Sequence, residues 1–166
     1  MGMSQIFEYP PVIFPNPIQW ENFPEALTRL PFLTYFKNTV IIVVLCVAGI
    51  LVSCSLSAYG LSRVQWKGRD KVFYLLMTSI MLPYFATIIP SFVMWTKLGL
   101  TNTFVPLTLP SWFGVGTVSV FGGGMFNIFL LRQFFRTIPK ELDEAARIDG
   151  AGHFTIFTKI ILPLSK

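Results

Sequence analysis

Three stretches of the chain carry no charged residue, and each is long enough to cross a bilayer. Residues 38–62 and 72–96 contain 25 residues each, and residues 112–131 contain 20. About 20 helical residues span the hydrocarbon core of a membrane. We therefore predict an all-α, polytopic membrane protein with spanning helices at residues 35–61, 72–96 and 112–131.

The segments between these runs differ in composition. Residues 1–34 contain six prolines and cannot form one long helix, although a short amphipathic helix is expected from about Asn22 to Leu30. Residues 62–71 form a short basic loop. Residues 97–111 hold a single charge beside glycine, asparagine and proline, and are expected to be a loop. Residues 132–166 are the most polar part of the chain.

Positive charge is distributed unevenly over these segments, which predicts the topology. Ten of the 13 Lys and Arg residues lie in 62–71 or 132–166, and three lie in the remaining parts of the chain. Positively charged residues concentrate in the cytoplasmic loops of membrane proteins. We therefore expect the amino terminus and residues 97–111 outside, with 62–71 and 132–166 in the cytoplasm.

Small residues recur every four positions in the first predicted span. Gly49, Ser53 and Ser57 share one face of a helix at this spacing. Such a face lets two helices pack closely in lipid. A hydroxyl-lined pathway for a polar solute is the alternative interpretation.

The second and third predicted spans contain residues that interrupt a helix. Pro83 predicts a kink in the second span, either static or moving between states. Gly122, Gly123 and Gly124 lie near the middle of the third span, where they predict a close helix contact, a break beside the translocation path or a hinge. Asn127 in the same span is expected to face protein rather than lipid.

The polar segment after the third span is predicted to start with a short helix. Thr137 is a candidate N-cap, and Pro139 suits the first helical turn. Asp143 and Arg147 lie four residues apart and are expected to pair on the exposed face. Gly150, followed by a second glycine, is expected to end this helix.

A second helix is expected after the glycines. Pro163 is predicted to end it. Its apolar residues recur at helical spacing and predict a buried face made by Phe154, Phe157, Ile160 and Ile161.

Seven residues of this segment have a fixed spacing, namely Glu144, Ala145, Ala146, Gly150, Ile160, Leu162 and Pro163. This spacing resembles that of the EAA loop of ABC importer permeases. Chance would give it in roughly one chain per million. The flanking sequence IPKELDEAARIDGAG most resembles the permeases of carbohydrate importers of the maltose-transporter type.

The resemblance implies a role for this loop. In that family the loop lies on the cytoplasmic face and docks into a cleft of the ATPase subunit. By this resemblance Glu144 would face a basic group of the ATPase. Small side chains would let the partner approach closely at Ala145, Ala146 and Gly150. The remaining residues assigned to the coupling loop are Asp149, Ile160, Leu162 and Pro163.

The resemblance also implies partners and a mechanism. The expected partners are a dimer of ABC ATPase subunits, a second permease subunit and an extracytoplasmic sugar-binding protein, in a bacterial or archaeal cytoplasmic membrane. The chain would form half of a pathway that works by alternating access. Such permeases usually have six membrane helices, so a chain with three is expected to be a fragment, a truncated gene product or one with a mis-assigned start.

Composition excludes several other classes of protein. Hydrophobic residues make up 53% of the chain and charged residues 13%, against about 25% charged in soluble domains. The net charge of +5 does not indicate nucleic acid, because the basic residues lie between apolar runs. The sequence has no phosphate-binding loop, so we do not expect it to hydrolyse ATP. Neither a cofactor nor a metal site is expected, since the one histidine and two cysteines form no ligand pattern.

Two alternatives to a sugar permease remain open. The first is a permease for another solute, such as an amino acid, a peptide or a metal complex. The second is a membrane scaffold without transport activity, whose polar segment is an amphipathic helical hairpin on the membrane surface.

Overall fold

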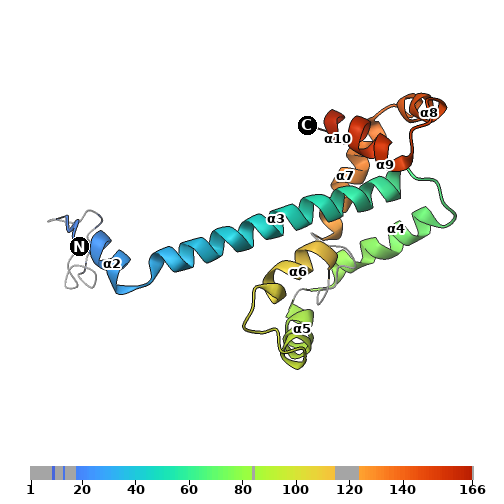
Figure 1. The fold of residues 1–166 in the computed structure, drawn as a ribbon. Coiled ribbons are helices and arrows are strands. Elements are labelled where there is room, and N and C mark those ends of the chain that lie inside the picture. Colours follow the sequence, from blue (N-terminus) through green and yellow to red (C-terminus); the bar gives the residue numbers. More distant parts are fainter. Residues whose placement is uncertain (1–8, 10–12, 14–17, 84, 115–123, 166) are drawn as a thin grey trace. The chain divides into compact units, whose positions relative to one another are not determined.

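The computed structural model describes residues 9, 13, 18–83, 85–114 and 124–165. Every regular element in these residues is helical, which confirms the all-α fold (Figure 1). The chain divides into two units, residues 1–41 and residues 42–166. In the first unit, helix α2 (Asn22–Arg29) agrees with the predicted amphipathic helix, and Arg29 pairs with Glu25 one turn earlier.

Helix α3 (Phe32–Ser62) is the element most clearly suited to crossing a membrane. It contains 31 residues, and its most apolar window has a mean hydropathy of 2.8. At 1.5 Å per residue, a helix of this length is about 46 Å long, which exceeds the hydrocarbon core of a bilayer. The helix predicted at residues 35–61 is therefore present.

The second predicted span is not one straight helix. It consists of α4 (Arg69–Met77), a 3-10 turn η1 (Thr78–Met81) and α5 (Phe85–Lys97), with a bend of more than 40° between them. The break falls where Leu82 adopts an extended conformation, with φ −80° and ψ 122°. Pro83 explains this, because a proline disfavours the helical conformation of the residue before it. Together the two pieces have the length and composition of a broken span or of a re-entrant loop.

The segment predicted as an external loop is partly helical. Helix α6 (Val105–Phe113) begins within residues 97–111 and continues beyond them. Pro106 lies in the first turn of α6, where a missing N–H costs nothing. The sequence analysis expected no helix here, because it treated glycine, asparagine and proline as loop residues.

The third predicted span, residues 112–131, is described at its two ends only. Helix α6 contains its first residues, and α7 (Met125–Thr137) contains its last and extends beyond residue 131. Gly122 and Gly123 lie outside the described residues. Gly124 immediately precedes α7 and has a φ of 84°, a conformation that glycine adopts easily.

Two helical pieces follow in the polar segment. Helix α8 (Glu141–Ile148) comes first, and then α9 (His153–Ile156), a π-helical turn η2 (Phe157–Ile161) and α10 (Leu162–Leu164) follow one another directly. The wide turn precedes Pro163, which has no N–H to donate to the carbonyl of Lys159. The helix–glycine–helix arrangement is thus present, although Thr137 ends α7 instead of capping α8.

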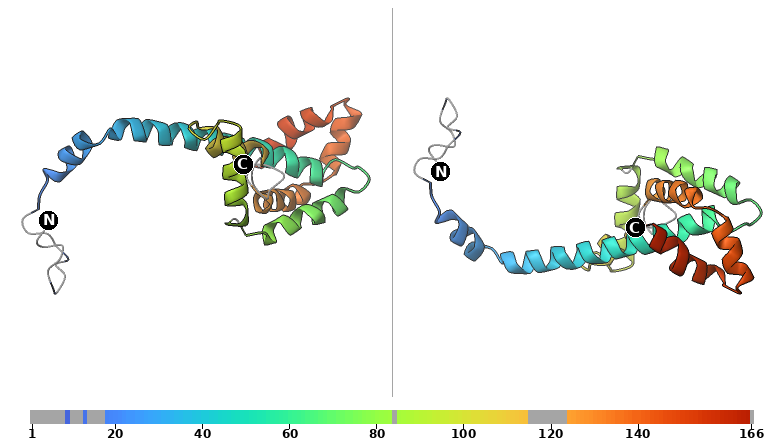
Figure 2. Two further views of the ribbon diagram at one scale, coloured as in Figure 1. Left: turned by 90° about the horizontal axis from the view of Figure 1, so that it is seen from below. Right: turned by 90° about the horizontal axis from the view of Figure 1, so that it is seen from above.

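The core of the second unit joins α3, α4, α7 and the helices after α8. Helix α7 lies beside both α4 and the carboxyl-terminal part of α3 (Figures 1 and 2). Of the predicted apolar face, Phe157 and Ile161 are buried, whereas Phe154 is 71% exposed. Fully buried side chains come from each of these elements, namely Ala58, Phe73, Ile128, Phe135, Ile156 and Ile161.

The face of small residues on α3 packs against α6. Gly49 is buried, and a Cβ added there would lie within 3.0 Å of the Trp112 side chain. The indole is fixed in place, since its Nε1 donates a hydrogen bond to the Leu45 carbonyl at 3.0 Å. Ser53 Oγ donates to the Ser111 carbonyl at 3.4 Å. Both contacts support the packing interpretation of this face.

We predict that Gly49→Ala destabilises the protein by about 1–3 kcal/mol, because the added methyl group overpacks the contact with Trp112. Thermal unfolding of the detergent-solubilised protein measures the effect. The matched control is Gly60→Ala on the same helix, where a Cβ meets nothing within 4 Å. The control should be neutral or stabilising by up to about 1 kcal/mol. Equal effects of the two substitutions would contradict the packing role of Gly49.

Candidate functional site

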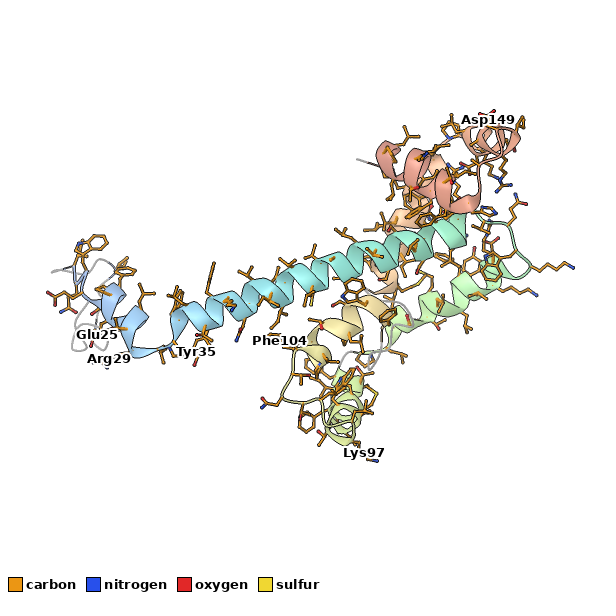
Figure 3. The ribbon with its side chains drawn as sticks, viewed as in Figure 1. Glu25, Arg29, Tyr35, Lys97, Phe104 and Asp149 are labelled. Carbon is orange, nitrogen blue, oxygen red and sulfur yellow. The ribbon has the colours of Figure 1, made fainter. Side chains whose placement is uncertain are left out.

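Helix α8 presents one polar face to the outside and holds the opposite face against the unit. Glu144, Ala145 and Asp149 are exposed, whereas Ala146 is half-buried and Asp143 is buried. Figure 3 shows Asp149 on one side of the second unit and Lys97 far from it on the other. The outward face of α8 is therefore free to contact another molecule along its length.

The end of α8 is a Schellman motif that depends on Gly150. The N–H of Ala151 bonds to the Ala146 carbonyl at 2.8 Å, and the N–H of Gly150 bonds to the Arg147 carbonyl at 3.0 Å. Gly150 has a φ of 83°, and a Cβ added there would meet nothing within 4 Å among the residues that the structure describes. Within the chain, glycine is thus required for its backbone conformation rather than for space.

Arg63 attaches α8 to the end of α3. Its Nη2 donates a hydrogen bond to the Ile138 carbonyl at 2.6 Å, and its Nη1 lies 3.4 Å from Asp143 Oδ2. Both side chains are more than nine-tenths buried. The predicted pairing of Asp143 with Arg147 was wrong: Asp143 points inward, because a buried guanidinium requires a carboxylate partner.

Arg132 makes the reciprocal contact from α7 to α3. Its Nε donates to the Leu61 carbonyl at 3.0 Å, and its Nη2 donates to Asp70 Oδ1 at 2.6 Å. The guanidinium carbon lies 3.9 Å from the centre of the Phe73 ring, a cation–π contact. Arg63 and Arg132 are called the arginine pair below.

The arginine pair satisfies carbonyl groups at the ends of two helices. The last four carbonyls of a helix have no partner within it. Arg132 bonds to one near the end of α3, and Arg63 bonds to the carbonyl directly after α7. Two further side chains donate hydrogen bonds to carbonyls at the end of α3. Trp66 Nε1 donates to the Gly60 carbonyl at 3.2 Å. Arg69 Nη1 donates to the Ser62 carbonyl at 3.2 Å.

A polar pocket of about 220 Å³ lies between the basic loop and α8. Five cationic side chains and two carboxylates line it, so the charge of its wall is positive. Arg132, which lies just beyond the third predicted span, is not among the lining residues. Its pKa is lowered by its burial and by the nearby charge of Arg136. The lining residues are Ser62, Arg63, Gln65, Arg69, Arg136, Lys140, Asp143, Glu144 and Arg147.

The other predicted residues are dispersed. Ile160 is half-buried against the core, whereas Leu162 and Pro163 are exposed. Ser57 is half-buried on α3, and Pro83 is exposed at the break before α5. Asn127 of α7 lines an apolar cavity of about 300 Å³ together with Ile50, Leu51, Cys54, Leu130 and Leu131.

The arginine pair was missed by the sequence analysis. Arg63 and Arg132 were counted only as positive charges at the ends of spans. Their position was the available signal, since each lies at the carboxyl-terminal end of an apolar run, where unpaired carbonyls are expected. Asp70, the only acid of the basic loop, was a second signal.

These features define a helical membrane protein with a stiff polar loop fixed to the ends of its apolar helices. The chain matches the family described as "Binding-protein-dependent transport system inner membrane component" over residues 55–166. The chain belongs to this family.

Similar proteins extend over almost the whole chain. The diacetylchitobiose uptake system permease protein NgcG of Streptomyces coelicolor is 31% identical over 94% of this chain and 49% of its own length. The sn-glycerol-3-phosphate transport system permease protein UgpE of Yersinia pestis is 33% identical over 98% of this chain and 57% of its own length. The chain thus spans about half the length of these relatives.

A solved structure also has a similar fold. A chain in the crystal structure of a bacterial ABC transporter involved in the import of the acidic polysaccharide alginate matches with a TM-score of 0.65 and 29% sequence identity. The match covers 81% of this chain and 44% of that one.

We predict that Gly150→Ala destabilises the end of α8 by about 1–2 kcal/mol, because an L-residue is strained at this positive φ. Hydrogen–deuterium exchange of the α8 amides measures the change. Gly152→Ala is the matched control, since Gly152 has a φ of −75° and a Cβ there also meets nothing within 4 Å. Faster exchange in both variants, or in neither, would contradict a conformational role specific to Gly150.

We predict that Arg63→Met releases α8 from α3, because it leaves the buried Asp143 carboxylate without its cation. Breaking such a pair costs about 3–5 kcal/mol. Amide exchange in residues 141–148 should accelerate strongly, and adding Asp143→Leu should reverse part of the change. Lys67→Met, an exposed position in the same basic loop, is the control. Unchanged exchange in Arg63→Met would show that Arg63 does not hold α8.

Proposed function

We propose that this chain is part of the permease subunit of an ABC importer for sugars or related polyhydroxylated solutes. The observation that carries the proposal is the exposed face of α8, at Glu144 and Ala145, on a loop fixed by Arg63 to the end of a membrane-length helix. A subunit that receives movement from an ATPase requires both features. One face must be free for the partner, and the loop must be stiff.

The solute class is supported by the relatives. Their names mention diacetylchitobiose, sn-glycerol-3-phosphate and maltodextrin, and the solved structure concerns alginate. All four solutes carry two or more hydroxyl groups. A pathway for such solutes needs hydrogen-bonding groups at membrane depth, and Ser57 and Asn127 are candidates on α3 and α7.

The mechanism we propose passes movement from the loop to the membrane helices through the arginine pair. An ATPase dimer would grip α8 and displace it. Arg63 would carry the displacement to α3, and Arg132 with Asp70 would carry it to α7 and α4. The break at Pro83 would let α5 lag behind α4. A second permease subunit would complete the pathway, and an extracytoplasmic binding protein would deliver the solute.

This mechanism requires the basic loop and α8 to lie in the cytoplasm, with residues 97–111 outside. The positive-inside rule supports this orientation. The far separation of Lys97 from Asp149 within the second unit is compatible with it (Figure 3). ATP hydrolysis would belong to the partner subunit.

We predict that Glu144→Arg in the full-length protein abolishes co-purification of an ABC ATPase from native membranes, because Glu144 would meet a basic group of the partner. Thermal unfolding should be unchanged, since Glu144 is exposed and has no ion pair among the described residues. Ala145→Trp should have the same effect by steric exclusion, without any change of charge.

The matched control is Glu21→Arg, the same charge reversal at an exposed position of the first unit. It should retain the ATPase. Recovery of the ATPase with Glu144→Arg and Ala145→Trp would overturn the coupling role of α8. Failure to recover any ATPase with the unmodified protein would favour the scaffold alternative.

A further inference from the structure

The pocket between the basic loop and α8 has more positive charge than the chain itself neutralises. Arg63 and Arg69 form ion pairs with carboxylates, at 3.4 Å and 3.5 Å. The other three cations, Arg136, Lys140 and Arg147, have no carboxylate within 4.0 Å among the described residues. They come from the end of α7, the turn after it and the last turn of α8.

The floor of this pocket is buried and only partly satisfied by protein groups. The Arg63 side chain is 3% exposed, and its Nε has no hydrogen-bond partner in the described part of the chain. Asp143 Oδ1 and Arg69 Nε, the atom that lies 3.5 Å from Asp70 Oδ1, likewise have no hydrogen-bond partner there. Buried polar groups are normally paired, and those left over are commonly found at binding sites.

We propose that this pocket binds a phosphate group, carried either by an anionic phospholipid or by a soluble phosphate. Three unpaired cations beside a buried guanidinium repel one another, and a bound anion would remove the repulsion. Arginine suits phosphate because its guanidinium presents several donors in a plane. A volume of about 220 Å³ accommodates a phosphate with part of a headgroup, but not a folded protein segment.

The position of the pocket allows either source. Its residues directly follow the apolar runs of α3 and α7, so it would lie at the membrane surface in the orientation proposed above. Basic pockets at this depth attract anionic headgroups. A bound phosphate would also bridge Arg147 of α8 to Arg136 of α7, and would thereby stiffen the attachment of the loop.

The test uses the full-length protein that contains this chain, purified into nanodiscs with its partner subunits. One arm adds phosphatidylglycerol to phosphatidylcholine nanodiscs and counts retained phosphatidylglycerol by native mass spectrometry. The other arm titrates inorganic phosphate into phosphatidylcholine nanodiscs by calorimetry. The variant is Lys140→Gln with Arg147→Gln. The matched control is Lys67→Gln with Lys71→Gln, which removes the same charge from exposed positions outside the pocket.

We expect binding of either phosphatidylglycerol or inorganic phosphate, and the ligand that binds identifies the source of the phosphate group. The pocket variant should weaken binding about tenfold for each cation removed, whereas the control should bind like the unmodified protein. Absence of binding in both arms, or an equal loss in the variant and the control, would overturn the proposal. Ala145→Trp, at an exposed position that is not among the pocket-lining residues, should keep the phosphate site while losing the ATPase, so failure of this inference is distinguishable from failure of the coupling role.

Discussion

The second unit depends on how the carbonyl groups at the ends of α3 and α7 are satisfied. Both helices end next to one another, so two sets of unpaired carbonyls and two negative dipole ends meet in one place. In a largely apolar chain such groups cannot be left unpaired without a large cost. Arg63, which directly follows α3, bonds to the carbonyl directly after α7. Arg132, which lies on α7, bonds to a carbonyl near the end of α3. Asp143 and Asp70 then neutralise the two buried cations.

This arrangement has a consequence for movement. The guanidinium groups bond to backbone carbonyls at the ends of α3 and α7, and Arg63 also pairs with Asp143, so the loop, α3 and α7 are joined to one another. Asp70 adds α4 to the same group. A displacement of α8 would therefore move several membrane helices together, and bending would be concentrated where the backbone is already broken, at Leu82 and Pro83. Arg63 and Arg69, which bond to carbonyls after α7 and at the end of α3, also line the basic pocket.

Patterns that depend on neighbouring residues were predictable from the sequence, and those that depend on distant residues were not. The apolar run of α3 and the glycine at the end of α8 follow from local rules, and both are present. Asp143 was expected to pair within its own helix, but a buried arginine 80 residues earlier decides its direction. Phe154 lies at helical spacing with Phe157 yet is 71% exposed, whereas Ile156, which was not assigned to the apolar face, is buried.

The packed face of α3 could not be predicted from hydrophobic periodicity. Its buried positions include small residues such as Gly49, Cys54 and Ala58, whereas Val44 and Leu51 are 60% and 63% exposed. A helix that is apolar all round gives no periodic signal for its packed face, so only residue size distinguishes the two sides. Continuous apolar surface of this extent is not stable in water. The large residues must therefore meet lipid or further helices, while the small Gly49 allows the close contact with Trp112 of α6.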